Sequence, residues 1–185
     1  TRLRGLLNIF DKHILADNGH LKLFFDDDWN CSYDIFSYGH DIEASWLLHE
    51  AALVLGDKEM LARIEARVPS VVAAASEGFT PAGGMIYEKL GEEIDGDRHW
   101  WVQAEAVVGY FNLWEHFGAE EGLENALHCW EFINAGLIDR ENGEWFWSVR
   151  ADGTVNRDDD KAGFWKCPYH NSRMCLEIIE RTATI

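Results

Sequence analysis

The chain has 185 residues, and its 33 Asp and Glu outweigh its 16 Lys and Arg, which gives a formal net charge of −17. This charge argues against nucleic acid or an anionic membrane surface as a partner, because both attract basic proteins. With 47% apolar residues and only three prolines, the composition predicts one globular domain and excludes a disordered chain.

The sequence shows no sign of a membrane segment, a metal or a cofactor. No apolar run approaches the ~20 residues that cross a bilayer, and the first residues form no signal-peptide core. We therefore expect a cytoplasmic protein without a membrane partner. The four cysteines form no C-x-x-C pair, so we expect neither a metal site nor a disulfide framework.

Hydrophobic periodicity predicts six helices, at residues 2–16, 40–55, 57–76, 99–117, 120–135 and 169–182. The first, third and fifth carry one apolar stripe and a polar opposite face, as outer helices with one side in water do. The second and fourth are apolar nearly all round, so they must be covered on most sides. The sixth takes the next covered place if this alternation continues.

A longer connection follows each outer helix, with short strand-like pieces at residues 21–25, 85–87 and 145–149. These connections lead to the first turns of the second, fourth and sixth helices, which hold His40, Trp100, Trp101 and His170. If the inner helices run parallel, these clusters share one rim, and the long loops build a pocket above them. We predict an all-α fold, a toroid of paired helices with short β-hairpin pieces in its loops. A closed toroid needs about twice as many helices, which indicates part of a larger domain.

The first cluster, at residues 37–43, enters the second helix. Helical spacing places His40 and Glu43 on neighbouring positions of one face, and a carboxylate beside an imidazole raises its pKa and fixes its orientation. Such a pair is a usable proton carrier. The alternative is that Asp41 and Glu43 merely favour the positive end of the helix, while His40 helps to cap it.

The second cluster, at residues 164–173, enters the sixth helix behind Pro168. His170 then lies in the first turn, with Arg173 one turn further along the same face. A histidine next to a fixed cation favours its neutral form, and hence acts as a base. The alternative is a solvated helix end, although two imidazoles at equivalent places in the repeat weigh against it.

The third cluster begins the fourth helix with adjacent tryptophans, which are usually core residues on a covered helix. Trp101 and Trp165 on one rim would nevertheless offer flat apolar faces that suit the C–H faces of a sugar ring. Gln103 and Glu105 are candidate partners for its hydroxyl groups. We interpret the remaining histidines as surface or packing residues: His13, His20, His49, His116 and His128.

Residues 39–48, 100–106 and 163–173 resemble the cellobiose 2-epimerase branch of the N-acylglucosamine 2-epimerase family. The resemblance runs from end to end of the chain. It implies an (α/α)6 barrel, of which residues 1–185 form the C-terminal half. It also implies cofactor-free inversion at C2 of the reducing-end sugar in a β-1,4-linked disaccharide of the cellobiose or mannobiose type.

The resemblance further implies roles for single residues. The residues that match His40 and His170 are the family's proton carriers, which act through an enediolate, and the residue that matches Glu43 supports the first of them. Which imidazole acts as base stays open. Substrate-binding residues expected beside them are Trp101 and Trp165, by stacking, together with Glu105 and Arg173.

The family places further sugar-contacting residues, among them a histidine and an arginine, on inner helices upstream of this chain. We therefore expect little or no activity from the 185-residue chain alone, with the missing N-terminal half of the barrel as its partner. Three other functions stay open: an aldose–ketose isomerase, a glycosidase that uses Glu43 and Glu105, and a non-catalytic carbohydrate-binding fragment. The sequence also leaves open whether the substrate is a disaccharide or a monosaccharide, and whether the protein forms a homo-oligomer.

Overall fold

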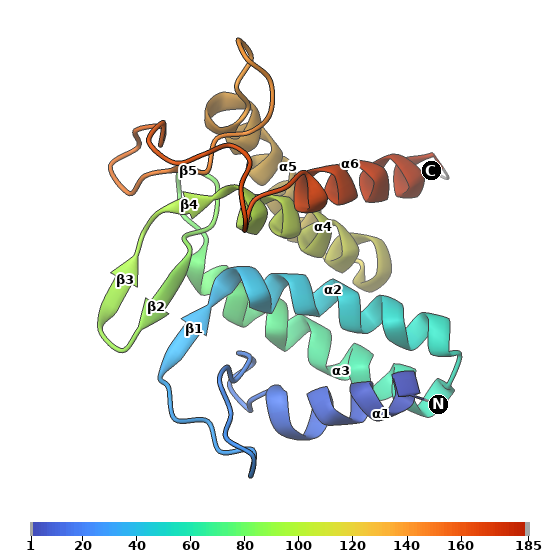
Figure 1. The fold of residues 1–185 in the computed structure, drawn as a ribbon. Helices are drawn as coiled ribbons and strands as arrows, with labels where there is room; N and C mark the ends of the chain where they lie inside the picture. Colours follow the sequence, from blue (N-terminus) through green and yellow to red (C-terminus); the bar gives the residue numbers. More distant parts are fainter. Residues whose placement is uncertain (1, 184–185) are drawn as a thin grey trace.

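Six α-helices, joined alternately by long loops and short turns, make up most of residues 2–183, the part of the chain that the computed structural model describes (Figure 1). They are α1 (Arg2–Ile9), α2 (Tyr38–Leu55), α3 (Lys58–Ala75), α4 (Trp100–Phe117), α5 (Glu120–Phe132) and α6 (Tyr169–Thr182). Single turns of π-helix or 3-10 helix extend the three outer helices, at η1 (Phe10–Ile14), η2 (Ser76–Gly78) and η3 (Ile133–Leu137). All six predicted helices are confirmed. No helix in the described range has the length and apolarity needed to cross a membrane.

Short turns connect each inner helix to the next outer one. Gly56 and Gly118 end α2 and α4 in the left-handed conformation, at φ 68° and 69°, which glycine adopts without strain. One residue further, Asp57 caps α3, because its carboxylate accepts the N–H groups of Glu59 and Met60 at 3.1 and 3.0 Å. The chain therefore reverses direction at once after α2 and α4.

The predicted alternation of outer and inner helices is confirmed for the first five. α2 packs against α1, α3 and α4, and α4 packs in addition against α5 and α6. The contact between the two inner helices is close, because a Cβ at Gly109 of α4 would lie 2.6 Å from Ile42 of α2. α1, α3 and α5 each keep one face in water.

α6 departs from this alternation. Only Asn171 and Met174 are buried on it, whereas Leu176 and Ile179 are 60% and 63% exposed. The helix packs on α4, and within residues 2–183 no further helix covers its other face. By its place in the repeat α6 is the third inner helix, but only its side toward α4 is packed within residues 2–183, so the prediction of a covered sixth helix is wrong for this part of the chain.

The described part of the chain also contains five short strands. β1 (Ile35–Ser37), β2 (Glu88–Leu90) and β3 (Glu93–Asp95) form an antiparallel sheet in that order, and β4 (Arg98–His99) pairs antiparallel with β5 (Ser148–Val149). Of the three predicted strand-like pieces, only residues 145–149 contain a strand. The other two contribute isolated bridges, because tight turns let each piece pair at single positions only.

The strands and long loops gather at the end of the molecule where α2, α4 and α6 begin (Figure 1). β1 continues directly into α2, and β4 continues directly into α4. The first turns of the three inner helices are therefore held at one rim.

Candidate functional site

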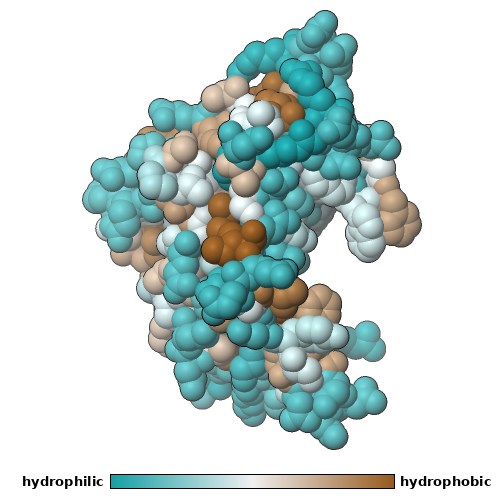
Figure 2. All heavy atoms as spheres, turned by 90° about the vertical axis from the view of Figure 1, so that its left-hand side faces the viewer, coloured by the Kyte–Doolittle hydropathy of each residue, from teal (hydrophilic) through white to brown (hydrophobic). Residues whose placement is uncertain are grey.

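The first turns of α2, α4 and α6 line a cavity of about 450 Å³, called here the central cavity. The predicted rim pocket is thus present, and His40 and His170 both face it. Figure 2 views this end of the molecule, whose surface is deeply hollowed at one side. The lining residues are His40, Glu43, Tyr87, His99, Trp100, Trp101, Trp147, Trp165 and His170.

His40 lies in the first turn of α2 and is held by a hydroxyl group. Its Nδ1 is 2.7 Å from Oγ of Ser37, and its ring centroid is 4.9 Å from that of Trp101. The ring opens onto the cavity, yet desolvation by the surrounding protein lowers its pKa, against the opposite effects of Glu43 and Asp41. The predicted rise in pKa is therefore wrong, and His40 favours its neutral form.

Gly39 brings this turn against the aromatic wall of the cavity. A Cβ at this position would lie 2.5 Å from the indole of Trp101 and 2.7 Å from the side chain of Val102. Only a residue without a side chain leaves room for this approach. Gly39 therefore permits the contact between His40 and Trp101.

Glu43 pairs with Arg173 rather than with His40. One guanidinium nitrogen of Arg173, Nη2, lies 2.6 Å from a carboxylate oxygen of Glu43 and 2.6 Å from one of Glu105. Burial alone would lower the pKa of Arg173, but the two carboxylates outweigh it and raise the pKa. These pairs join α2, α4 and α6 behind the cavity wall, because each helix contributes one of the three side chains.

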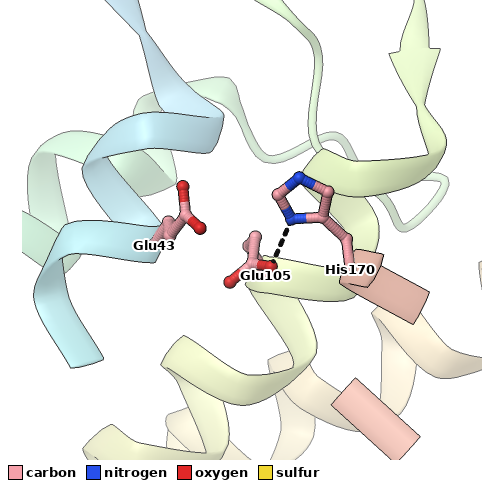
Figure 3. Close-up of side chains that lie close together, drawn as sticks. All are labelled: Glu43, Glu105 and His170. Carbon is pink, nitrogen blue, oxygen red and sulfur yellow. Dashed lines mark hydrogen bonds and ion pairs between the residues drawn. The ribbon is translucent and has the colours of Figure 1, made fainter. Parts of the chain in front are cut away.

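His170 donates from its Nδ1 to Oε1 of Glu105 at 2.7 Å (Figure 3). Glu105 is 1% exposed, and its second oxygen accepts the indole N–H of Trp46 at 3.0 Å. With its proton on Nδ1, a neutral imidazole presents the lone pair of Nε2, which points away from Glu105 in Figure 3. Arg173, the expected neighbour of the ring, binds the same oxygen of Glu105 as His170 does.

The predicted substrate-binding residues therefore divide into two groups. Trp101 and Trp165 line the central cavity, and Trp165 is 79% exposed at its edge. Glu105 and Arg173 lie behind the wall, where they hold His170 and Glu43. The prediction for Gln103 is wrong, because its side chain is fully buried and bound to the backbone of the loop before α4.

Glu43, Glu105 and His170 are the three labelled side chains of Figure 3, and their ligand atoms lie within 4.8 Å of one another. Such a cluster would suit a cation by residue type. Here the guanidinium of Arg173 already supplies a positive charge between the two carboxylates. The absence of a resident metal stays a prediction, in agreement with this charge balance.

Two aromatic residues of the wall, Tyr87 and Trp147, were not anticipated from the sequence. Tyr87 stacks on His99 with ring centroids 4.1 Å apart, and Trp147 lies 4.7 Å from Trp100. Burial lowers the pKa of His99. Their position in the sequence could have indicated a place in the wall, because both residues belong to the strand-like pieces that precede inner helices.

His20 and Asp41 form a buried pair beside the cavity, at 3% and 1% exposure. Nδ1 of His20 is 2.7 Å from a carboxylate oxygen of Asp41. The interpretation of His20 as a packing residue is confirmed. Asp41 does more than favour the helix end, because its other oxygen accepts the N–H of Leu21 at 2.8 Å and holds that loop.

The sequence profile of the N-acylglucosamine 2-epimerase (GlcNAc 2-epimerase) family matches residues 3–173. The cellobiose 2-epimerase of Bacteroides fragilis is 61% identical over 181 residues, which are 96% of this chain and 46% of that protein.

Solved structures agree with this match. A sugar epimerase from a ruminal bacterium superposes with a TM-score of 0.93 at 41% identity, over 97% of this chain and 47% of that one. For the cellobiose 2-epimerase of Bacillus thermoamylovorans the TM-score is 0.90 at 38% identity, over 97% and 46% of the two chains.

The chain spans about half the length of the proteins it matches. Its alternating outer and inner helices accordingly correspond to about half of an (α/α)6 barrel. The family profile covers most of the chain, and the relatives share its sequence and its fold. The chain belongs to the N-acylglucosamine 2-epimerase family.

Proposed function

We propose that the complete protein is a sugar 2-epimerase that inverts C2 of the reducing-end residue in a β-1,4-linked disaccharide of the cellobiose type. The similarity to cellobiose 2-epimerases supports this proposal. The observation that carries it is the presence of two imidazoles, from His40 and His170, in one cavity of about 450 Å³. A cavity of this size accommodates a sugar ring.

Inversion at C2 begins with opening of the ring to an aldehyde. The aldehyde makes the C2 proton removable, because the electron pair left behind is shared with the C1 oxygen as an enediolate. One imidazole removes this proton as a base, and the other, in its protonated form, assists ring opening or donates its proton to the opposite face of C2, so that the two rings exchange protonation states. Substrate and product have the same composition, so no other reactant is consumed.

The surroundings of the two histidines suit them to this work. His40 favours its neutral form because the protein around it lowers its pKa. Glu105 binds Nδ1 of His170 and thereby fixes the orientation of this cavity residue, whose Nε2 points away from Glu105 (Figure 3). General acid–base catalysis of this kind contributes roughly 10²–10⁴-fold in rate for each group.

The aromatic wall provides the means to hold the sugar. Trp101 and Trp165 offer indole faces to the cavity, against which the C–H groups of a pyranose can pack. Trp165 stands on the loop at the edge of the cavity, where its exposure leaves the ring free to stack on a substrate. We assign these two tryptophans to substrate binding.

The chain presents two apolar grooves on its flanks, which we propose the N-terminal half of the barrel covers. One, of about 510 Å³, lies between α1 and α2 and includes Leu6 and Leu47. The other, of about 410 Å³, lies beside α6 and includes Leu127 and Ile179. The first groove reaches His40, so the segment that covers it also closes the site. We accordingly expect little or no activity from this chain alone.

The test is a chimaera in which this chain is joined to the part of the Bacteroides fragilis cellobiose 2-epimerase that it does not match. With cellobiose in deuterated water, we expect a disaccharide whose reducing end is epimeric at C2 and carries deuterium there. The chain alone, assayed in parallel, should give no measurable product.

Other products would contradict the proposal in distinct ways. A ketose would indicate an aldose–ketose isomerase, and free monosaccharide would indicate a glycosidase. Cellobiose binding without any product would indicate a non-catalytic carbohydrate-binding protein. Robust epimerisation by this chain alone would overturn the proposed need for a second half.

A further inference from the structure

A buried polar side chain near the start of each inner helix ties that helix to the hairpin after the preceding outer helix. In α2, a carboxylate oxygen of Asp41 accepts the N–H of Leu21 at 2.8 Å. In α4, the amide of Gln103 accepts the N–H of Met85 at 2.7 Å and donates to its carbonyl at 2.7 Å. Leu21 and Met85 are equivalent, since each is the second residue of an isolated bridge that closes its hairpin.

The third inner helix makes this tie through an additional carboxylate. Trp145 occupies the equivalent place in the third hairpin. Its N–H donates to Oε1 of Glu144 at 3.0 Å, and the side-chain amide of Asn171 donates to the same oxygen at 3.0 Å. Asn171 directly follows His170 in the first turn of α6. Glu144 therefore joins the hairpin to the helix turn that presents His170.

The same oxygen of Glu144 also binds a buried lysine. Nζ of Lys166 lies 3.2 Å from it and donates to the carbonyls of Trp145 and Lys161 at 2.9 and 2.7 Å. The side chain of Lys166 is fully buried. Lys166 directly follows Trp165, so this ion pair anchors the loop that presents Trp165 to the cavity.

The backbone and the electrostatics both mark Glu144 as unusual. Its φ is 63°, in the left-handed region that few residues other than glycine, asparagine and aspartate adopt. Burial would raise its pKa, but the N–H of Trp145, Lys166 and Asn171 outweigh burial and lower it. The carboxylate is therefore kept ionised opposite the buried ammonium group.

We propose that Glu144 is a positioning residue that fixes two working parts of the central cavity at once. Through Asn171 it fixes the first turn of α6 with His170, and through Lys166 it fixes the loop with Trp165. The catalytic consequence rests on the proposed epimerase function, whereas the two ties are properties of the fold. In the other two inner helices a single side chain makes the tie directly.

Two substitutions separate the two ties in the chimaera described above. Lys166→Met releases the Trp165 loop and leaves α6 tied, so we expect KM for cellobiose to rise about tenfold with kcat within about twofold. Asn171→Ala releases the first turn of α6, so we expect kcat to fall about tenfold with KM within about twofold. Glu144→Ala should show both effects.

The conservative variant sharpens the test. Glu144→Gln keeps an oxygen that accepts from Trp145 and Asn171 but loses the charge opposite Lys166, so it should behave like Lys166→Met. Glu141→Gln, the same change at an exposed position of the same turn, should leave both constants unchanged. A merely structural role for Glu144 would give no such split between KM and kcat.

Amide hydrogen exchange tests the ties without reference to activity. Lys166→Met should speed exchange in residues 157–168, and Asn171→Ala should speed it in residues 169–173. The positioning role is overturned if exchange in both segments stays unchanged, or if both variants alter KM and kcat in the same proportion. If the unsubstituted chimaera is inactive while exchange responds as expected, the proposed function fails and the positioning role stands.

Discussion

His40 and His170 occupy equivalent places in the repeat, but their surroundings differ in kind. His40 is bound to the neutral hydroxyl of Ser37 and packed against Trp101. His170 is bound to the buried carboxylate of Glu105, which belongs to an ion-pair network across three helices. Equivalent helical positions thus give one imidazole that contacts a neutral hydroxyl and an indole, and one that is hydrogen-bonded to a buried carboxylate.

Loss of either imidazole should have the largest effect. In the chimaera we expect His40→Asn and His170→Asn each to lower kcat by about 10²–10⁴-fold, because each removes one of the two proposed proton carriers. Initial rates of C2 epimerisation of cellobiose measure this effect. His128→Asn, an exposed histidine on α5, is the matched control. Activity within a few-fold of the unsubstituted chimaera for either cavity variant would refute the two-histidine mechanism.

Removing the carboxylate beside His170 should come next. Glu105→Gln keeps the shape of the side chain but weakens its hold on His170 and on Arg173, so we expect kcat to fall by about 10²-fold. In urea unfolding, the free energy of unfolding should fall by about 3 kcal/mol, because the substitution breaks a buried ion pair. Initial rates of C2 epimerisation measure the change in kcat, and a urea titration measures the change in the free energy of unfolding. A full kcat with reduced stability would restrict Glu105 to a structural role.

The corresponding change beside His40 should be smaller. Ser37→Ala removes one neutral hydrogen bond, worth about 1 kcal/mol, so we expect kcat/KM to fall about fivefold. Parallel rates for Ser37→Ala and Glu105→Gln measure the contrast between the two imidazoles directly. Equal effects would show that both histidines depend on their partners to the same degree.

The smallest effect concerns pH. Because desolvation lowers the pKa of His40, its neutral form persists below pH 6.5, the usual imidazole pKa, and the acid limb of kcat/KM should lie below that value. Trp101→Ala opens this environment to water, so the limb should move up toward pH 6.5. Glu43 and Asp41 raise the pKa of His40 and His170 lowers it, and the substitution removes none of these three groups. If the acid limb of kcat/KM does not move in the Trp101→Ala variant, a group other than His40 is responsible for it.

Most of the helical framework could be predicted from the sequence. Periodicity located all six helices, and the apolar character of α2 and α4 marked them as inner. This placed His40, Trp101 and His170 correctly on one rim, because each lies in the first turn of an inner helix. The spacing of residues along each helix was sufficient to predict their positions wherever the packing of the helices repeats.

The partners of these side chains could not be predicted in the same way. Spacing along α2 suggested that Glu43 binds His40, but Arg173 of α6 reaches Glu43 from a distant part of the chain. Helical spacing is silent on such contacts between helices. The contacts made by the loops could not be predicted either, because the tie through Glu144 depends on a backbone turn that no periodicity indicates.

The tight contact at Gly39 has a consequence for the width of the central cavity. The start of α2 and the indole of Trp101 are in such close contact that a Cβ at Gly39 would lie only 2.5 Å from the indole. An alanine there would force the start of α2 and the indole of Trp101 apart, and it would introduce no polar group. The width of the cavity thus depends on Gly39, which does not itself line the cavity.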